Sequence, residues 1–255
     1  MAVSALVCLV LVGALALIDR AAGHKPVNAV PAPSSSASAS ATATPKASSS
    51  PSPTPTASVS TSDGSEGETA DAAGMQHTGL TGKGTWKGTT LTIAPARKEP
   101  VVHRVTVRAE DGTSVTADDA ARQVMSVLND PRGWLGHKGQ SFELVANPAQ
   151  AEFTISLASP GTAQKMCPLD VKMTWSCRAG KNVILNTDRW LYMTPTFNDL
   201  TAYRAYMVNH EVGHYIGFGH LGCAAKGQPA PVMMQQSKAL DGCTANPWPT
   251  ASEKK

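Results

Sequence analysis

The alternation of apolar and polar positions divides the chain into three parts: an apolar run, a long polar stretch, and a region of strand-like and helix-like patterns. The apolar run covers residues 2–18. It has the length of a signal-peptide core and is slightly short for a membrane span, and the small residues at 21–23 offer a weak cleavage site. We expect residues 1–23 to be a signal peptide or a retained membrane anchor, so that the protein is either secreted or anchored to the cell envelope with its domain outside.

The polar stretch is composed almost entirely of serine, alanine, threonine and proline from residue 31 to residue 62, and acidic residues extend it to Asp71. Such a composition buries too little apolar area to offset the entropy of ordering, and proline keeps it extended. Residues 24–77 are therefore expected to be a disordered linker, a passive spacer. The folded domain is expected at residues 78–250, followed by a tail at residues 251–255.

Five segments of the expected domain have β-character. One alternates between apolar and polar side chains, and the others are short runs rich in β-branched and apolar residues. We expect strands over residues 84–94, 101–109, 141–146, 152–157 and 182–186.

Two segments have helical periodicity. The first, residues 116–129, begins with Thr116 as N-cap and has Asp119 three residues later. The second begins near residue 198 or 199 and is expected to end at Gly217. The order of strands, helix, strands and helix predicts an α+β fold, in which a twisted mixed sheet is backed by two helices. After residue 220 the sequence predicts only a short loop region.

Charge gives little indication of a partner. The chain has 22 Lys and Arg against 19 Asp and Glu, a formal net charge of +3, and its basic residues are scattered. This pattern is typical of a solvated surface, so we expect no nucleic-acid partner and a monomer.

Four cysteines lie in the expected domain, and a fifth, Cys8, lies in the apolar run. An even number of cysteines in an exported domain predicts two disulfides, and the spacing lacks the close pairs of a cysteine zinc site. Three pairings are open. The local pairing is favoured, and it joins Cys167 to Cys177 and Cys223 to Cys243.

The strongest chemical signal is the run His-Glu-Val-Gly-His-Tyr-Ile-Gly-Phe-Gly-His at residues 210–220. On a helix, a spacing of four residues places His210 and His214 on one face, about 6 Å apart along the axis, so that both can bind one zinc ion. Gly217 permits a left-handed turn that returns His220 as the third ligand. Three protein ligands leave one position open for water, as a catalytic zinc requires.

Glu211 follows the first histidine and lies about 100° further round the helix, beside the expected metal. There it can act as general base toward a zinc-activated water. The alternative is that these residues are ordinary core or surface side chains. It is disfavoured because three histidines, a glycine and a glutamate would then share this spacing without purpose.

The segment at residues 210–220 resembles the signature of the metzincin clan of zinc metallopeptidases. Downstream, the run Pro-Val-Met-Met-Gln-Gln resembles the Met-turn of that clan, with Met233 as the methionine beneath the metal. Some clan members have a tyrosine ligand where this chain has Gln235, so no extra ligand is implied. The region of about residues 203–248 also resembles a secreted bacterial domain family of unassigned function.

The resemblance implies a zinc-dependent peptidase with one catalytic Zn²⁺ and a peptide or protein substrate. In the clan, an extended peptide pairs with a sheet-edge strand, for which residues 182–186 are the candidate, although they fit a central strand equally well. By residue type alone, Tyr192, Tyr206 and Tyr215 are candidates for a hydrogen-bond donor to the oxyanion of the transition state. Two other hypotheses stay open: a zinc-containing adhesion or assembly module without turnover, and a zinc hydrolase of a cell-wall peptide bond.

Overall fold

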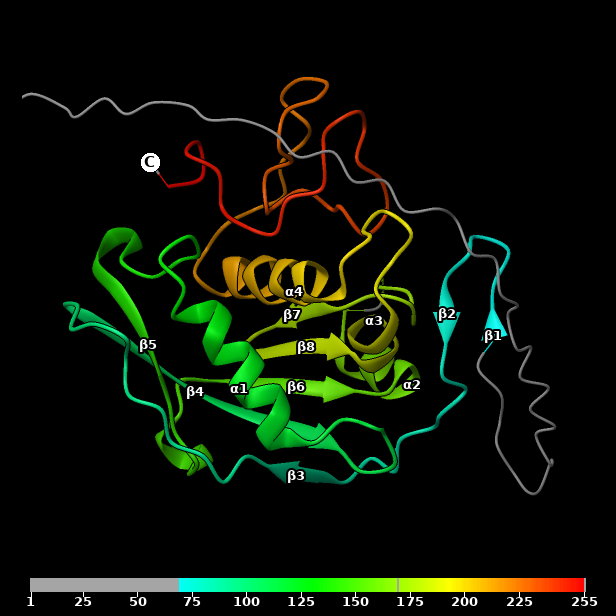
Figure 1. Cartoon of the computed structure of the whole chain (residues 1–255). Helices are drawn as coiled ribbons and strands as arrows, with labels where there is room; N and C mark the ends of the chain where they lie inside the picture. The colour runs from blue at the N-terminus through cyan, green and yellow to red at the C-terminus, as the bar shows by residue number, and fades with distance from the viewer. Residues whose placement is uncertain (1–68, 169, 255) are drawn as a thin grey trace, which may run out of the picture. The chain divides into compact units, whose positions relative to one another are not determined.

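The structure is a computed structural model that describes residues 69–168 and 170–254 (Figure 1). The expected signal peptide or anchor at residues 1–23, and all but the last residues of the expected linker, lie outside this part. Within it, no helix is both long enough and apolar enough to cross a membrane.

A mixed sheet of six strands forms the framework of the described chain (Figure 1). Its main path runs β3-β4-β6-β8-β7, and β5 also pairs with β4. Strand β4 is parallel to both β5 and β6, and β6 is parallel to β8. Strand β3 is antiparallel to β4, and β7 is antiparallel to β8. The strands are β3 (Trp86–Gly88), β4 (Val101–Glu110), β5 (Gln140–Leu144), β6 (Phe153–Ala158), β7 (Cys177–Ala179) and β8 (Asn182–Asn186).

Two of the strand predictions differ from this sheet. The strand expected at residues 84–94 is reduced to β3. The amide of Thr89 makes one further bond to the carbonyl of Val107, and the amide and hydroxyl of Thr90 then bond to the carboxylate of Asp118. The candidate edge strand, β8, is wrong as an edge, because it lies between β6 and β7. The short strand β7, which lacks a periodic pattern of its own, forms that edge.

The two expected helices pack side by side on one face of the sheet (Figure 1). Helix α1 (Ala117–Leu128) is capped by Thr116, whose hydroxyl accepts from the amide of Asp119. Helix α4 (Leu200–Tyr215) is capped by Asp199 and ends two residues before Gly217. The apolar stripes of both helices are buried against strand residues, and the shared core includes Val124, Leu128, Val208, Val212, Val107, Leu157 and Leu185.

Two short helices were not predicted. Helix α2 (Pro160–Met166) begins with proline, and α3 (Thr187–Tyr192) is capped by the side chain of Asn186. Both are too short for an apolar period to be read from the sequence.

The folded part begins earlier than the expected boundary at residue 78. Strands β1 (Thr69–Ala70) and β2 (Gln76–His77) form a two-stranded ribbon. Buried groups of α3 hold the end of this ribbon: Asp188 accepts hydrogen bonds from the amide and hydroxyl of Thr78, and Arg189 donates to the carbonyl of Gln76. These anchors lie more than one hundred residues away in sequence, so local composition could not reveal them.

The C-terminal region after residue 220 is irregular, as expected, and both disulfides have the favoured local pairing, Cys167–Cys177 and Cys223–Cys243. The expected tail at residues 251–255 is in part buried, contrary to the prediction. Within it Glu253 is buried, with 2% of its surface exposed, and its carboxylate bonds to the interior of the domain. The ordered domain therefore continues at least to this residue.

Candidate metal centre

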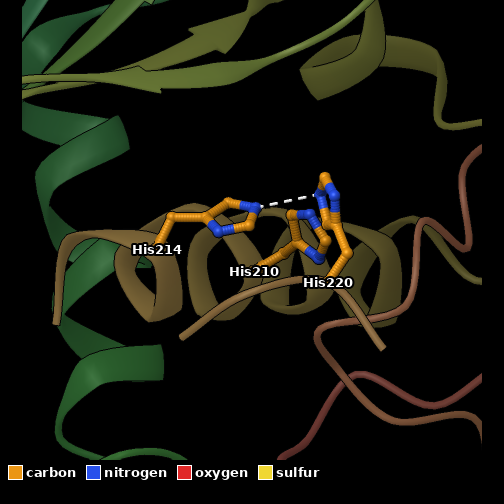
Figure 2. A group of neighbouring side chains, drawn as sticks. All are labelled: His210, His214 and His220. Carbon is orange, nitrogen blue, oxygen red and sulfur yellow. Dashed lines mark hydrogen bonds between the residues drawn. The ribbon is translucent and has the colours of Figure 1, made fainter. Parts of the chain in front are cut away.

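Three imidazoles meet at one end of the helix that carries the motif (Figure 2). His210 and His214 project from successive turns of α4. Gly217 has a φ of 103°, a left-handed value that suits glycine, and it turns the chain so that His220 comes back over the helix. The candidate ligand atoms of the three residues all lie within 4.8 Å of one another.

Backbone carbonyls fix the orientation of two of these rings. The Nδ1 of His210 donates to the carbonyl of Val232 at 2.7 Å, and the Nδ1 of His214 donates to the carbonyl of Phe218 at 2.8 Å. In a neutral imidazole the other nitrogen then carries a lone pair. The Nε2 atoms of both rings are thus left as electron-pair donors. In metal-binding histidines a carbonyl commonly orients the ring in this way, by accepting from the nitrogen that does not bind the metal.

The donor set suits a zinc ion. The Nε2 atoms of His214 and His220 lie 3.1 Å apart (Figure 2). Two nitrogens bound to one tetrahedral zinc at about 2.1 Å would be separated by roughly 3.4 Å. Lone pairs at such a distance repel each other unless a proton or a cation lies between them. A cation held by His210, His214 and His220 satisfies all three, and zinc is the metal for which neutral imidazole is a preferred ligand.

The surroundings keep the imidazoles neutral. Burial lowers the pKa of His210 to about 3, and burial is also the main reason that the pKa values of His214 and His220 lie below 6.5. A protonated imidazole cannot bind a metal. These rings are therefore in a ligand-competent form throughout the neutral pH range.

Glu211 lies beside the three histidines and lines the same cavity. It is buried, with 6% of its surface exposed, and its Oε2 atom has no hydrogen-bond partner among the described residues. Burial without a partner raises the pKa of this carboxyl to about 8. An unsatisfied buried carboxyl is costly, and this one faces a cavity in which a polar ligand or water could bond to it.

Met233 packs directly beneath the helix. A Cβ atom added to Gly213 would lie 2.4 Å from the Sδ of Met233 and 3.1 Å from the ring of Trp134, so the methionine approaches α4 only because residue 213 is glycine. Met234 instead joins a separate small cluster with Ala230 and Cys243. Met233, and not Met234, is therefore the methionine that packs against the helix carrying His210 and His214.

The turn that carries Met233 is tied to both sides of the centre. The carbonyl of Val232 orients His210, and the carbonyl of Met233 accepts from the amide of Leu221, which follows His220. On the other side, the carboxylate of Glu253 accepts from the amides of Val232 and Met233 at 3.1 and 2.8 Å. Sequence reasoning missed Glu253 because nothing in its neighbourhood indicates burial.

A cavity of about 1180 Å³ opens above the histidines. One wall is the loop between Cys167 and Cys177 together with strand β7, and another is formed by residues 235–238 after the turn. Asp71 and Met75 of the N-terminal ribbon complete the lining. The walls of the cleft are therefore built by the end of the expected linker, by the loop between Cys167 and Cys177, and by the expected loop region after residue 220.

The three tyrosines suggested as donors have different outcomes. Tyr206 lines the cleft, but its hydroxyl already donates to the carbonyl of Met234 at 3.0 Å. Tyr215 stacks on Phe153 and lines a second cavity instead. Tyr192 does not line the cleft. None of them therefore points a free hydroxyl at the histidines.

Comparison with known proteins gives one match. A family model described as "Protein of unknown function (DUF3152)" matches residues 72–250. No curated protein and no solved structure matches the chain. The matched range begins inside the N-terminal ribbon, in agreement with the ordered start of the domain, and it contains all of the candidate centre.

Proposed function

We propose that this chain, which belongs to the family of proteins of unknown function DUF3152, is an exported zinc-dependent peptidase. In this proposal His210, His214 and His220 hold one Zn²⁺, and Glu211 is the general base. The substrate is a peptide or protein that lies across the cleft above the histidines.

The observation that carries the proposal is the arrangement of the three histidines, which are oriented and neutral as metal ligands must be. Two of them are oriented by backbone carbonyls, all three are neutral, and their ligand atoms converge. A purely structural zinc site would be closed by a fourth protein ligand. Among the described residues, only these three histidines form a metal-binding group, and they lie in an open cleft beside a buried carboxyl.

A bound zinc would polarise the scissile carbonyl and acidify a water molecule. The remaining work falls to the chain itself. Glu211 is close enough to the histidines to accept a proton from a water in the cleft and to pass it to the leaving nitrogen. Its Oε2 has no hydrogen-bond partner among the described residues and can take that proton. Burial alone would keep this carboxyl protonated near neutral pH. A bound Zn²⁺ beside it would lower its pKa and leave the carboxylate that accepts the proton.

The edge strand β7 suits the binding of an extended peptide. It pairs with β8 on one side only, and Cys177 and Arg178 line the cleft. A peptide that adds to this edge would run past the histidines and leave its side chains to the flanking walls. This assignment replaces β8 as the candidate pairing strand.

Export is supported by the two disulfides, which indicate an oxidising compartment. The apolar run at residues 2–18 would direct the chain there as a cleaved signal or hold it at the membrane.

The test is digestion of a peptide library by the purified chain, with zinc and with a chelator, combined with elemental analysis. Wild-type protein should contain one zinc per chain and cleave peptides in a chelator-sensitive manner. His214→Ala should lose most of its zinc, because one of three protein ligands is removed. Glu211→Gln should keep its zinc and lose cleavage by about a hundredfold or more. Asp170→Asn, which changes another carboxylate of the cleft wall, should retain both.

Two results would contradict the proposal. Full zinc content in His214→Ala would refute the ligand assignment. Zinc binding by the wild type without cleavage of any library peptide or cell-wall peptide would favour an adhesion or assembly module.

A further inference from the structure

Cationic side chains line the candidate cleft on both sides of the histidines. Lys172 and Arg178 belong to the wall formed by the disulfide loop and β7, and Lys238 belongs to the opposite wall, after the turn of Met233. All three are exposed, and none of them takes part in an ion pair among the described residues. Their charges are available to a ligand.

The lining has three carboxylates, against these three exposed cations and the buried Arg189. Asp71 accepts hydrogen bonds from the amides of Ala73 and Met75, and Glu211 belongs to the candidate centre itself. Asp170 is the remaining one. The walls therefore present more positive than negative charge to whatever lies between them.

Two of the cations lie close to the histidines and on different walls. Arg178, from strand β7, and Lys238, from the segment after the turn, line the same cavity as His214 and His220. The Nζ of Lys238 is 5.9 Å from the ring centroid of Trp175, which belongs to the facing wall. A chain lying over the histidines would thus pass between Arg178 and Lys238.

The positive lining continues along the edge of the sheet. Arg178 also borders a second cavity of about 550 Å³, together with Lys181 and His103. A segment that follows β7 out of the cleft therefore meets one further cationic side chain, that of Lys181. Clefts lined by one sign of charge concentrate ligands of the opposite sign.

We infer that the cleft selects peptide segments rich in aspartate and glutamate. Arg178 and Lys238 bind these acidic side chains from opposite walls. A peptide is the fitting polyanion because the open edge of β7 can pair with a peptide backbone. The inference rests on the proposed function for the location of the substrate, but acidic selectivity is a property of the walls and can be measured without cleavage.

The experiment uses the zinc-loaded full chain with Glu211→Gln, so that bound peptides stay intact. Two labelled peptides of equal length differ only in having glutamate or lysine at alternate positions, and fluorescence anisotropy gives their Kd values at low and high salt. The charge-reversed variant Arg178→Glu with Lys238→Glu is compared with Lys83→Glu and Lys98→Glu, which makes the same change of net charge outside both cavities.

The expected result is that the parent protein binds the glutamate peptide roughly tenfold more tightly than the lysine peptide at low salt, as two exposed charge pairs would allow. High salt should reduce this ratio. The cleft reversal should abolish or invert the preference, and the control pair should leave it largely unchanged. Because zinc is present in every variant, its own attraction for acidic groups cancels in the comparison.

Equal binding of the two peptides by the parent protein would overturn the inference, and so would an equal loss of preference in the control pair. A single-stranded oligonucleotide that bound as tightly as the acidic peptide would overturn the assignment to peptides. Failure of the peptidase proposal is a separate outcome, because it is read from library digestion and not from these Kd values.

Discussion

At the scale of single residues, the candidate centre depends on a close approach that only glycine allows. The Sδ of Met233 occupies the space that a side chain at position 213 would need. Gly213 falls at a position of the motif where the signature accepts any residue, so the motif itself does not explain the choice. The explanation is packing between the helix and a turn twenty residues away in sequence.

We predict that Gly213→Ala destabilises the domain by up to about 2 kcal/mol. Alanine gains about 1 kcal/mol in helix propensity, but overpacking against a buried Met233 and Trp134 costs about 1–3 kcal/mol. Urea unfolding of the metal-free chain measures the net change. Gly161→Ala in α2 is the matched control, since its added Cβ would meet nothing within 4 Å. Equal responses of the two variants would contradict the packing argument.

A second residue-scale prediction concerns Glu253. Its carboxylate satisfies the amides of Val232 and Met233 and also that of Thr250. Glu253→Gln replaces one acceptor by a donor that faces these amides, so it should lower stability by about 1–3 kcal/mol. Because the carbonyl of Val232 orients His210, zinc affinity should fall as well. Competition with a fluorescent chelator measures that affinity. Ser252→Ala, a neighbouring surface change, should leave it intact.

At the scale of elements, the sheet and helix α4 supply the frame, and irregular segments close the site. Cys223 and Cys243 pack with Ala230 and Met234 in a small cluster that is separate from the main core, to which Val232 and Met233 belong. The other disulfide, Cys167–Cys177, closes the loop that forms a wall of the cleft. The two bonds therefore support different parts of the site.

Removal of the two bonds should have different consequences. Replacing Cys223 and Cys243 by serine should cost about 3 kcal/mol of local stability, increase hydrogen exchange in residues 221–245 and reduce zinc retention. Replacing Cys167 and Cys177 should leave zinc retention near the wild-type level and loosen the cleft wall instead. Zinc analysis and exchange mass spectrometry of both variants decide this. Identical zinc loss in the two would mean that the bonds do not act on separate regions.

At the scale of the whole molecule, buried carboxylates join segments that are far apart in sequence. Glu110, at the end of β4, accepts from the amide of Gly84, the amide of Ser159 and the hydroxyl of Thr162. Burial alone would raise the pKa of Glu110, but these hydrogen bonds outweigh it and hold the pKa below 4.5. The carboxylate thus ties the start of β3 to the start of α2.

The lowered pKa of Glu110 makes the free energy of unfolding depend on pH. The contribution of a carboxyl whose pKa is lowered by folding is present above the pKa of the unfolded chain, here 4.5, and is lost as pH falls through the folded value. The free energy of unfolding should therefore fall below about pH 4.5, and Glu110→Gln should reduce that fall. Chelator in all samples removes the effect of zinc release, and Glu143→Gln serves as control. An unchanged acid slope in Glu110→Gln would contradict this role.

The sequence by itself determined the convergence of the three histidines, the two main helices and four of the strands, and it favoured the disulfide pairing that the structure has among three that were open. These features are local or depend on chemistry of fixed spacing: a helical repeat brings His210 and His214 to one face, and Thr116 caps its own helix. They need no knowledge of distant partners.

Only the tertiary structure decided which strand forms the edge, where the domain begins and ends, and what lines the cleft. The N-terminal ribbon is held by Asp188, more than 100 residues away, and Glu253 is held by the turn at Val232, 21 residues away. Strand β7 pairs with the neighbouring β8, and only the assembled sheet shows that its other side is open. Composition describes a segment's own preference and not the surface it meets. Where long-range hydrogen bonds outweigh that preference, a segment whose composition predicts a linker or a tail becomes part of the folded domain.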